Sequence, residues 1–217
     1  KVLDKNFPTI DPKKPYALTK EEEDIMERLE RAFENCEKLQ RHMHFLLNKG
    51  GLYKVYNGNL LYHGCVPLKE DGNLKSVRIF GRAYKGKGLY EVLESYVRKG
   101  FYAMDPKEKE RGKDIMWYIW LSENSPLFGK DKMATFERYF LAEKETHKEK
   151  KNPYYLLLED EKVVGKILKE FGLESEDAHI INGHVPVKCK DGENPVKCGG
   201  KVLVIDGGFS KAYQKET

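Results

Sequence analysis

Residues 60–67 read Leu60-Leu61-Tyr62-His63-Gly64-Cys65-Val66-Pro67, an apolar run that ends in a histidine beside a glycine. A second run of the same character, Ile180-Ile181-Asn182-Gly183-His184-Val185-Pro186, lies far along the chain. Each run predicts a buried strand, and glycine at a strand end lets a ligand or another segment come close. A neutral imidazole presented there is a common metal ligand. His63 and His184 are therefore candidate metal ligands. On the residues alone, the alternative that each is an ordinary turn histidine stays open.

Further strands are predicted on both sides of these runs. Asn57-Gly58 joins two β-rich arms, at 52–56 and 59–63, and is a strong signal for a tight hairpin. Residues 75–86 resemble another hairpin that turns at Gly81. Near the end of the chain, strands are expected at 179–183, in two hairpin arms on either side of 190–194, and at 201–206.

Helical spacing of apolar residues predicts the remaining elements. One helix is expected from Thr19, which forms a capping box with Glu22, to Gly50-Gly51. Another is expected in the aromatic-rich run 113–122, with Trp117 and Trp120 in the core. Three more are predicted at 89–102, at 131–144 and at 160–171. This mixed order favours an α+β arrangement over a Rossmann fold, and no glycine-rich phosphate loop occurs.

The composition excludes several classes of protein. The 217 residues carry 39 Lys plus Arg against 35 Asp plus Glu, a net charge of +4, which gives no electrostatic case for nucleic acid. No apolar run reaches the roughly 18 residues of a membrane span. Four cysteines are too few for a disulfide scaffold, so a cytoplasmic protein with reduced thiols is expected. The chain begins at Lys1, not Met, and we expect an interior piece of a larger protein, with residues 1–18 as an extended connector.

The two histidine runs resemble the last two histidine motifs of calcineurin-like metallophosphoesterases. The likeness to one group, the bacterial class III fructose-1,6-bisphosphatases, extends over essentially the whole chain and is carried by residues 60–67, 123–139, 144–154 and 180–210. The resemblance implies a manganese-dependent, two-metal phosphatase in which His63 and His184 bind the same ion. It also implies that residues 19–217 form part of a metallophosphatase β-sandwich with flanking helices and a largely helical insertion at about 88–172.

The resemblance further implies hydrolysis of the 1-phosphate of fructose 1,6-bisphosphate to fructose 6-phosphate in gluconeogenesis. The family's Asp-x-His, Gly-Asp-x-x-Asp and Gly-Asn-His-Asp/Glu motifs, which supply the other ligands and a catalytic histidine, are absent from this sequence. We therefore expect them in an N-terminal remainder of the parent chain. Two imidazoles without carboxylates leave the charge of a dication uncompensated. The 217-residue chain alone is accordingly expected to bind manganese weakly and to be inactive.

Other candidate residues have weaker support. Lys130, Lys132 and Arg138 follow the loop at Ser125-Pro126 and could face a sugar bisphosphate, although charge runs usually form a solvated surface. Cys189 and Cys198 form at most half of a zinc site, because no Cys-x-x-Cys occurs. Cys65 has no positioned base that would make it a nucleophile. His42 and His44, two residues apart on a helix, point to different faces.

Two other interpretations are kept. The closer one is a metallophosphoesterase of another specificity, such as a phosphoprotein phosphatase. The more distant one is a non-catalytic interaction or regulatory fragment.

Overall fold

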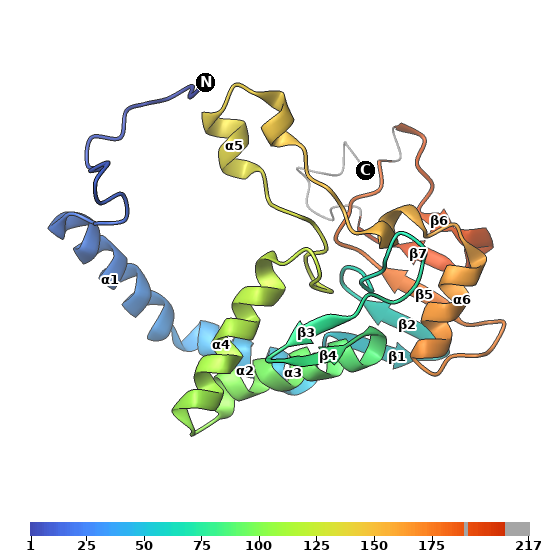
Figure 1. The fold of residues 1–217 in the computed structure, drawn as a ribbon. Coiled ribbons are helices and arrows are strands. Elements are labelled where there is room, and N and C mark those ends of the chain that lie inside the picture. The colour runs from blue at the N-terminus through green and yellow to red at the C-terminus, as the bar shows by residue number, and fades with distance from the viewer. Residues whose placement is uncertain (189–190, 207–217) are drawn as a thin grey trace. The chain divides into compact units, whose positions relative to one another are not determined.

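The computed structural model describes residues 1–188 and 191–206, which form two compact units. The first unit comprises Lys1–Gly51 and Ala134–Lys148, and the second comprises Leu52–Met133 and Glu149–Thr217. Figure 1 shows the elements along the chain. No helix in the described part of the chain is long and apolar enough to cross a membrane.

The first unit contains α1 (Lys20–Glu34), α2 (Glu37–Lys49), α5 (Thr135–Phe140) and the short 3-10 helix η1 (Lys144–His147). The capping box of Thr19 and Glu22 at the start of α1 is confirmed. Residues 1–18 form turns and isolated bridges, and Val2 pairs with Leu141.

Two helix predictions in the first unit are wrong in their bounds. The single helix expected from Thr19 to Gly50 is interrupted, because the Asn35 amide donates to the Arg31 carbonyl at 2.8 Å and ends α1. The helix expected at 131–144 is shortened to α5. The residues at the start of the expected helix are not helical, because Asp131 is bound to another segment. Asp131 N–H donates to the Lys150 carbonyl, and the Asp131 carboxylate accepts from Lys150 N–H.

The second unit is built on a five-stranded sheet with the order β1-β2-β5-β7-β6. The strands are β1 (Tyr53–Tyr56), β2 (Asn59–Tyr62), β5 (His179–Asn182), β6 (Val196–Lys197) and β7 (Val202–Val204). The three central strands, β2, β5 and β7, are parallel, while β1 and β6 are antiparallel edges. The hairpin at Asn57-Gly58 is confirmed, and so is the one at Gly81, formed by β3 (Val77–Ile79) and β4 (Arg82–Tyr84).

The expected hairpin between residues 186–189 and 195–198 is not what the structure shows. β6 pairs instead with β7, and positive φ angles at Gly199 and Gly200 (58° and 100°) allow the tight turn between them. Cys189, in the other expected arm, lies outside the described residues.

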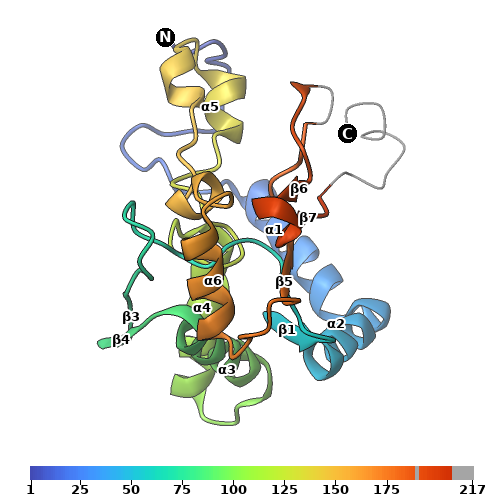
Figure 2. The ribbon, with the colours of Figure 1, turned by 90° about the vertical axis from the view of Figure 1, so that its right-hand side faces the viewer.

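Helices α3 (Gly86–Tyr102), α4 (Pro106–Leu121) and α6 (Glu161–Glu170), with the 3-10 turn η2 (Pro153–Leu156), complete the second unit. The prediction of α6, closed by Gly172, is confirmed. One face of the sheet is buried against α6 and the start of α3, in a core that includes Leu60, Ile180, Tyr90 and Ile167. Figure 2 shows the sheet nearly on edge, with α3 and α6 on one side of it.

The prediction that Trp117 and Trp120 lie in the core is wrong. Both indoles are exposed, at 68% and 69%. The face that α4 buries carries Gly112, Ile115 and Ile119, because α4 packs against α3 at two glycines. A Cβ added to Gly112 would lie 2.2 Å from the Gly100 Cα.

This close approach of α3 and α4 predicts that Gly112→Ala destabilises the protein. The added methyl group would meet backbone atoms, and overpacking of this kind costs about 1–3 kcal/mol. Gly165→Ala in α6 is the matched control, since a Cβ there has nothing within 4 Å and alanine favours helix by up to about 1 kcal/mol. Urea unfolding of both variants measures the difference. Equal stabilities would contradict the tight α3–α4 contact.

Candidate metal centre

His63 directly follows β2 at the carboxyl end of the parallel strands. Its carbonyl accepts a hydrogen bond from Gly183 N–H at 2.9 Å, which ties the end of β2 to the end of β5. The next residue, Gly64, lies against the segment 125–128, and a Cβ at this position would be 2.3 Å from the Pro126 carbonyl oxygen. Glycine is therefore required for the chain to turn here.

His184 lies two residues beyond β5, with a φ of 69°. This left-handed conformation is uncommon for a residue with a side chain, and strained backbone of this kind clusters at functional sites. In register, Leu60 pairs with Ile180, so β2 and β5 end at the same edge of the sheet. The histidines that follow them are brought to one place for that reason.

The two rings meet there, as we expected from the sequence. Nε2 of His63 is 3.0 Å from Nδ1 of His184, and the ring centroids are 4.9 Å apart at 63°. Two imidazole nitrogens about 2.1 Å from one ion, at right angles to each other, lie about 3 Å apart. The separation therefore fits two neighbouring ligands of a single cation. The metal-binding role itself stays a prediction.

The surroundings of His184 favour the neutral imidazole that binds metals. The pKa of His184 is lowered, first by burial and then by the charges of His63 and Lys130, against smaller opposite effects of the Phe128 backbone and Asp206. Among the residues that the structure describes, none forms a hydrogen bond of normal geometry with Nε2 of this half-buried ring. An imidazole whose Nδ1 binds metal carries its proton on Nε2, and this N–H needs an acceptor such as a carbonyl nearby. The backbone of Phe128 is close enough to raise the pKa of His184 through a hydrogen-bonding interaction.

The pair does not form a complete metal site by itself. Among residues 1–188 and 191–206, no group of three or more His, Cys, Asp or Glu side chains could hold an ion. Asp206, just after β7, acts on His184 electrostatically but does not complete such a group. In the described part of the chain, the pair therefore offers two imidazole ligands to a cation.

The three basic residues predicted to face a substrate belong to two different units. Lys130 belongs to the second unit, where its ammonium bonds Glu149 at 3.3 Å and its charge reaches His184. Lys132 is half-buried in the same unit. Arg138 belongs to the first unit, where its guanidinium donates to the His147 carbonyl at 3.4 Å. The charge of Lys130 acts on His184 and lowers its pKa.

Several supporting residues were missed in the sequence. Ser125 is fully buried, donates to the Ile119 carbonyl at 2.7 Å and accepts from Leu127 N–H at 3.1 Å. It therefore fixes the segment whose Pro126 carbonyl accepts from Cys65 N–H at 2.9 Å. The Asn182 amide donates to the Gly64 carbonyl at 3.0 Å. The sequence offered one signal for each residue. Ser125 is followed by a proline just after a predicted helix, and Asn182 is a polar residue inside an apolar run.

Neither Cys65 nor Cys198 has an activated thiol. Cys65 is fully buried, and burial raises the pKa of its thiol to about 12. Cys198 is also buried, and its pKa is raised chiefly by desolvation. The zinc half-site that would need Cys189 involves a residue outside the described part of the chain.

Comparisons with known proteins agree with the sequence resemblance. A family model described as Firmicute fructose-1,6-bisphosphatase matches residues 1–217. Proteins named fructose-1,6-bisphosphatase class 3 from Clostridium botulinum strain Hall and Clostridioides difficile strain 630 are each 56% identical to this chain over 218 aligned positions. The alignments cover 100% of this chain and 33% of each relative. The chain thus spans about a third of the length of these curated relatives. No solved structure matches it.

The raised pKa of Cys65 predicts a protected thiol. In a Cys189→Ser/Cys198→Ser background, we expect iodoacetamide at pH 8 to label the exposed Cys36 alone. At that pH a thiol of pKa about 12 is thiolate in about one molecule in ten thousand. Mass spectrometry before and after urea unfolding gives the count, and Cys36→Ser is the control with no fast label. Labelling of Cys65 in the folded protein at the rate of Cys36 would contradict the packing of Gly64 and Cys65 on residues 125–127.

Proposed function

Because this chain belongs to the Firmicute fructose-1,6-bisphosphatase family, we propose that it is the C-terminal part of a metal-dependent phosphatase acting on fructose 1,6-bisphosphate. The reaction releases the 1-phosphate and gives fructose 6-phosphate, as a gluconeogenic step in the cytoplasm. The observation that carries the proposal is the 3.0 Å approach of the His63 and His184 ring nitrogens. The names of the relatives favour this substrate over a phosphoprotein.

In this proposal His63 and His184 hold one manganese ion of a two-metal centre, and the rest of the parent protein supplies the carboxylate ligands. When bound, manganese supplies Lewis-acid chemistry toward a phosphoryl group. The contribution of this chain is to position the ligands. The parallel strands fix the backbone of both histidines, the Gly183–His63 hydrogen bond fixes their spacing, and burial keeps His184 neutral.

Lys130 is the basic residue that we assign to the phosphate groups of the substrate. Its positive charge lowers the pKa of His184. The ammonium pairs with Glu149, and the side chains of Lys130 and Glu149 are 23% and 18% exposed. A partly buried ammonium beside a metal centre attracts phosphate more strongly than an exposed one, because water screens it less. Lys132 and Arg138 stay weaker candidates.

The second face of the sheet supports a metallophosphatase sandwich. Leu61, Ile181 and Leu203 lie in one row across β2, β5 and β7 and are only half-buried, on the face opposite the helix-covered core. Val196, which continues the row on β6, is 44% exposed. Parallel sheets are normally covered on both faces. We assign this row to a second sheet from the N-terminal remainder of the parent, which would carry the missing ligands.

The proposal predicts that the two histidines matter in the full-length protein and that the 217-residue chain alone is inactive. His63→Ala and His184→Ala should each weaken manganese binding, measured calorimetrically, by more than about a hundredfold and abolish release of phosphate. His42→Ala, on the exposed face of α2, is the matched control. Two outcomes would contradict the proposal. One is full turnover in either histidine variant, and the other is a rate for the isolated chain within tenfold of the full-length rate.

A β-sandwich in the parent protein predicts that a glutamate destabilises the fold on the second face of the sheet but not at an exposed position. In the full-length protein, Leu203→Glu should lower the free energy of unfolding by several kcal/mol, because it buries an unpaired carboxylate between two sheets. Leu156→Glu, at a side chain 81% exposed, should stay within about 0.5 kcal/mol of wild type. Chemical denaturation of both variants provides the comparison. An effect of Leu203→Glu no larger than that of Leu156→Glu would show that nothing covers this face.

A further inference from the structure

The third parallel strand of the sheet is followed by an acidic residue at the edge where the two histidines lie. β7 runs parallel to β5, and the pairing continues past the end of β7, because Ile205 N–H donates to the Asn182 carbonyl at 2.8 Å. Asp206 comes two residues after β7, just as His184 comes two residues after β5. Since β2, β5 and β7 are all parallel, Asp206 shares the sheet edge of His63 and His184.

The backbone of Asp206 is fixed beside the histidine pair. Its carbonyl accepts a hydrogen bond at 3.2 Å from Val187 N–H, in the segment that follows His184. On its other side lies Gly183, whose N–H bonds the His63 carbonyl. A Cβ added to Gly183 would lie 3.5 Å from the Asp206 Cβ and 3.7 Å from the His63 carbonyl oxygen. Glycine therefore leaves no side chain at position 183 between Asp206 and His63.

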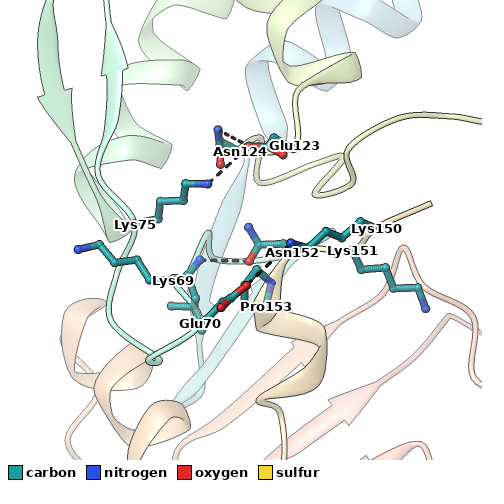
Figure 3. Close-up of a pocket in the computed structure, with 10 residues that line it drawn as sticks. Lys69, Glu70, Lys75, Glu123, Asn124, Lys150, Lys151, Asn152 and Pro153 are labelled. Carbon is teal, nitrogen blue, oxygen red and sulfur yellow. Dashed lines mark hydrogen bonds and ion pairs between the residues drawn. The ribbon is translucent and has the colours of Figure 1, made fainter. Parts of the chain in front are cut away.

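The carboxylate of Asp206 has no cationic partner among the residues that the structure describes. Other charges in the second unit are paired. Around a cavity of about 310 Å³ (Figure 3), for example, Lys75 lies 3.5 Å from Glu123 and Lys150 lies 3.8 Å from Glu70. Asp206 is half-buried, so water and salt screen its charge less than that of an exposed carboxylate. It is thus available to balance a positive charge.

A cation at the histidine pair would bring such a charge. The two imidazoles are neutral ligands, and the nearby ammonium of Lys130 is already paired with Glu149. Asp206 is the carboxylate whose charge acts on His184. It does not complete a group of three ligands with the histidines in the described chain, so its place is outside the coordination shell. Groups in that position tune how strongly a site holds its metal.

We propose that the Asp206 carboxylate balances the charge of the cation held by His63 and His184 without ligating it. This inference rests on the proposed function, because it requires that ion. The role depends on negative charge and not on shape. Asparagine, which has nearly the same shape, should therefore fail to replace Asp206, while glutamate should largely succeed.

The test is calorimetric titration of the full-length protein with manganese. Asp206→Asn should weaken binding by about tenfold to a hundredfold, and Asp206→Glu should recover most of this loss. Asp177→Asn is the matched control, because it removes the same charge from an exposed position before β5, at the opposite edge of the sheet. There the solvent screens the charge, and affinity should change by less than about twofold.

Urea unfolding of the metal-free protein separates this role from a structural one. The unfolding midpoint of Asp206→Asn should equal that of wild type, and a clearly lower midpoint would overturn the inference. Wild-type manganese affinity in Asp206→Asn, or equal losses in Asp206→Asn and Asp206→Glu, would also overturn it. His63→Ala shows which idea has failed. If His63→Ala weakens manganese binding and Asp206→Asn does not, only this inference fails. If His63→Ala binds manganese as wild type does, the proposed function fails as well.

Discussion

The parallel pairing of β2 with β5 is the constraint on which the rest of the second unit depends. Leu60 and Ile180 are completely buried side by side, and this burial sets the register, because a slip of either strand by one residue would turn its buried side chain to the other face. Both strands then end at one edge of the sheet. That shared edge is why two histidines from distant parts of the sequence have ring nitrogens 3.0 Å apart.

The segment that follows α4 supports this edge from the side. Ser125 anchors it, the Pro126 carbonyl binds Cys65 N–H, and the ring of Phe128 lies 6.3 Å from that of His184. Asn182 fastens Gly64 from the neighbouring strand. The histidines are thus held in place by hydrogen bonds and packing from residues other than the two candidate ligands, as preorganised sites require.

Local signals in the sequence were enough for the hairpins at Asn57-Gly58 and Gly81, the capping box, α6 and the two strands that precede the histidines. These local signals failed where contacts between residues far apart in the sequence determine the structure. The pattern of α4 did not show that Trp117 and Trp120 are exposed, because the buried face is chosen by contact of Gly112 with Gly100. Lys130 and Arg138 looked equivalent, yet they belong to different units. Asp206 reaches the edge of the histidine pair through the pairing of β7 with β5, so no spacing rule could identify it.

The sequence distance between the paired histidines has a consequence for the order of events in biosynthesis. His63 and His184 are 121 residues apart, and ribosomes add about 5–20 residues per second. The strand before His63 therefore waits about 6–24 s for the strand that pairs with it. Pairing between such distant strands is also intrinsically slow, because a long loop must close first. During this time a lone imidazole can hold an ion only loosely. Under the proposed metal-binding role, selective metal loading therefore follows the closure of the sheet.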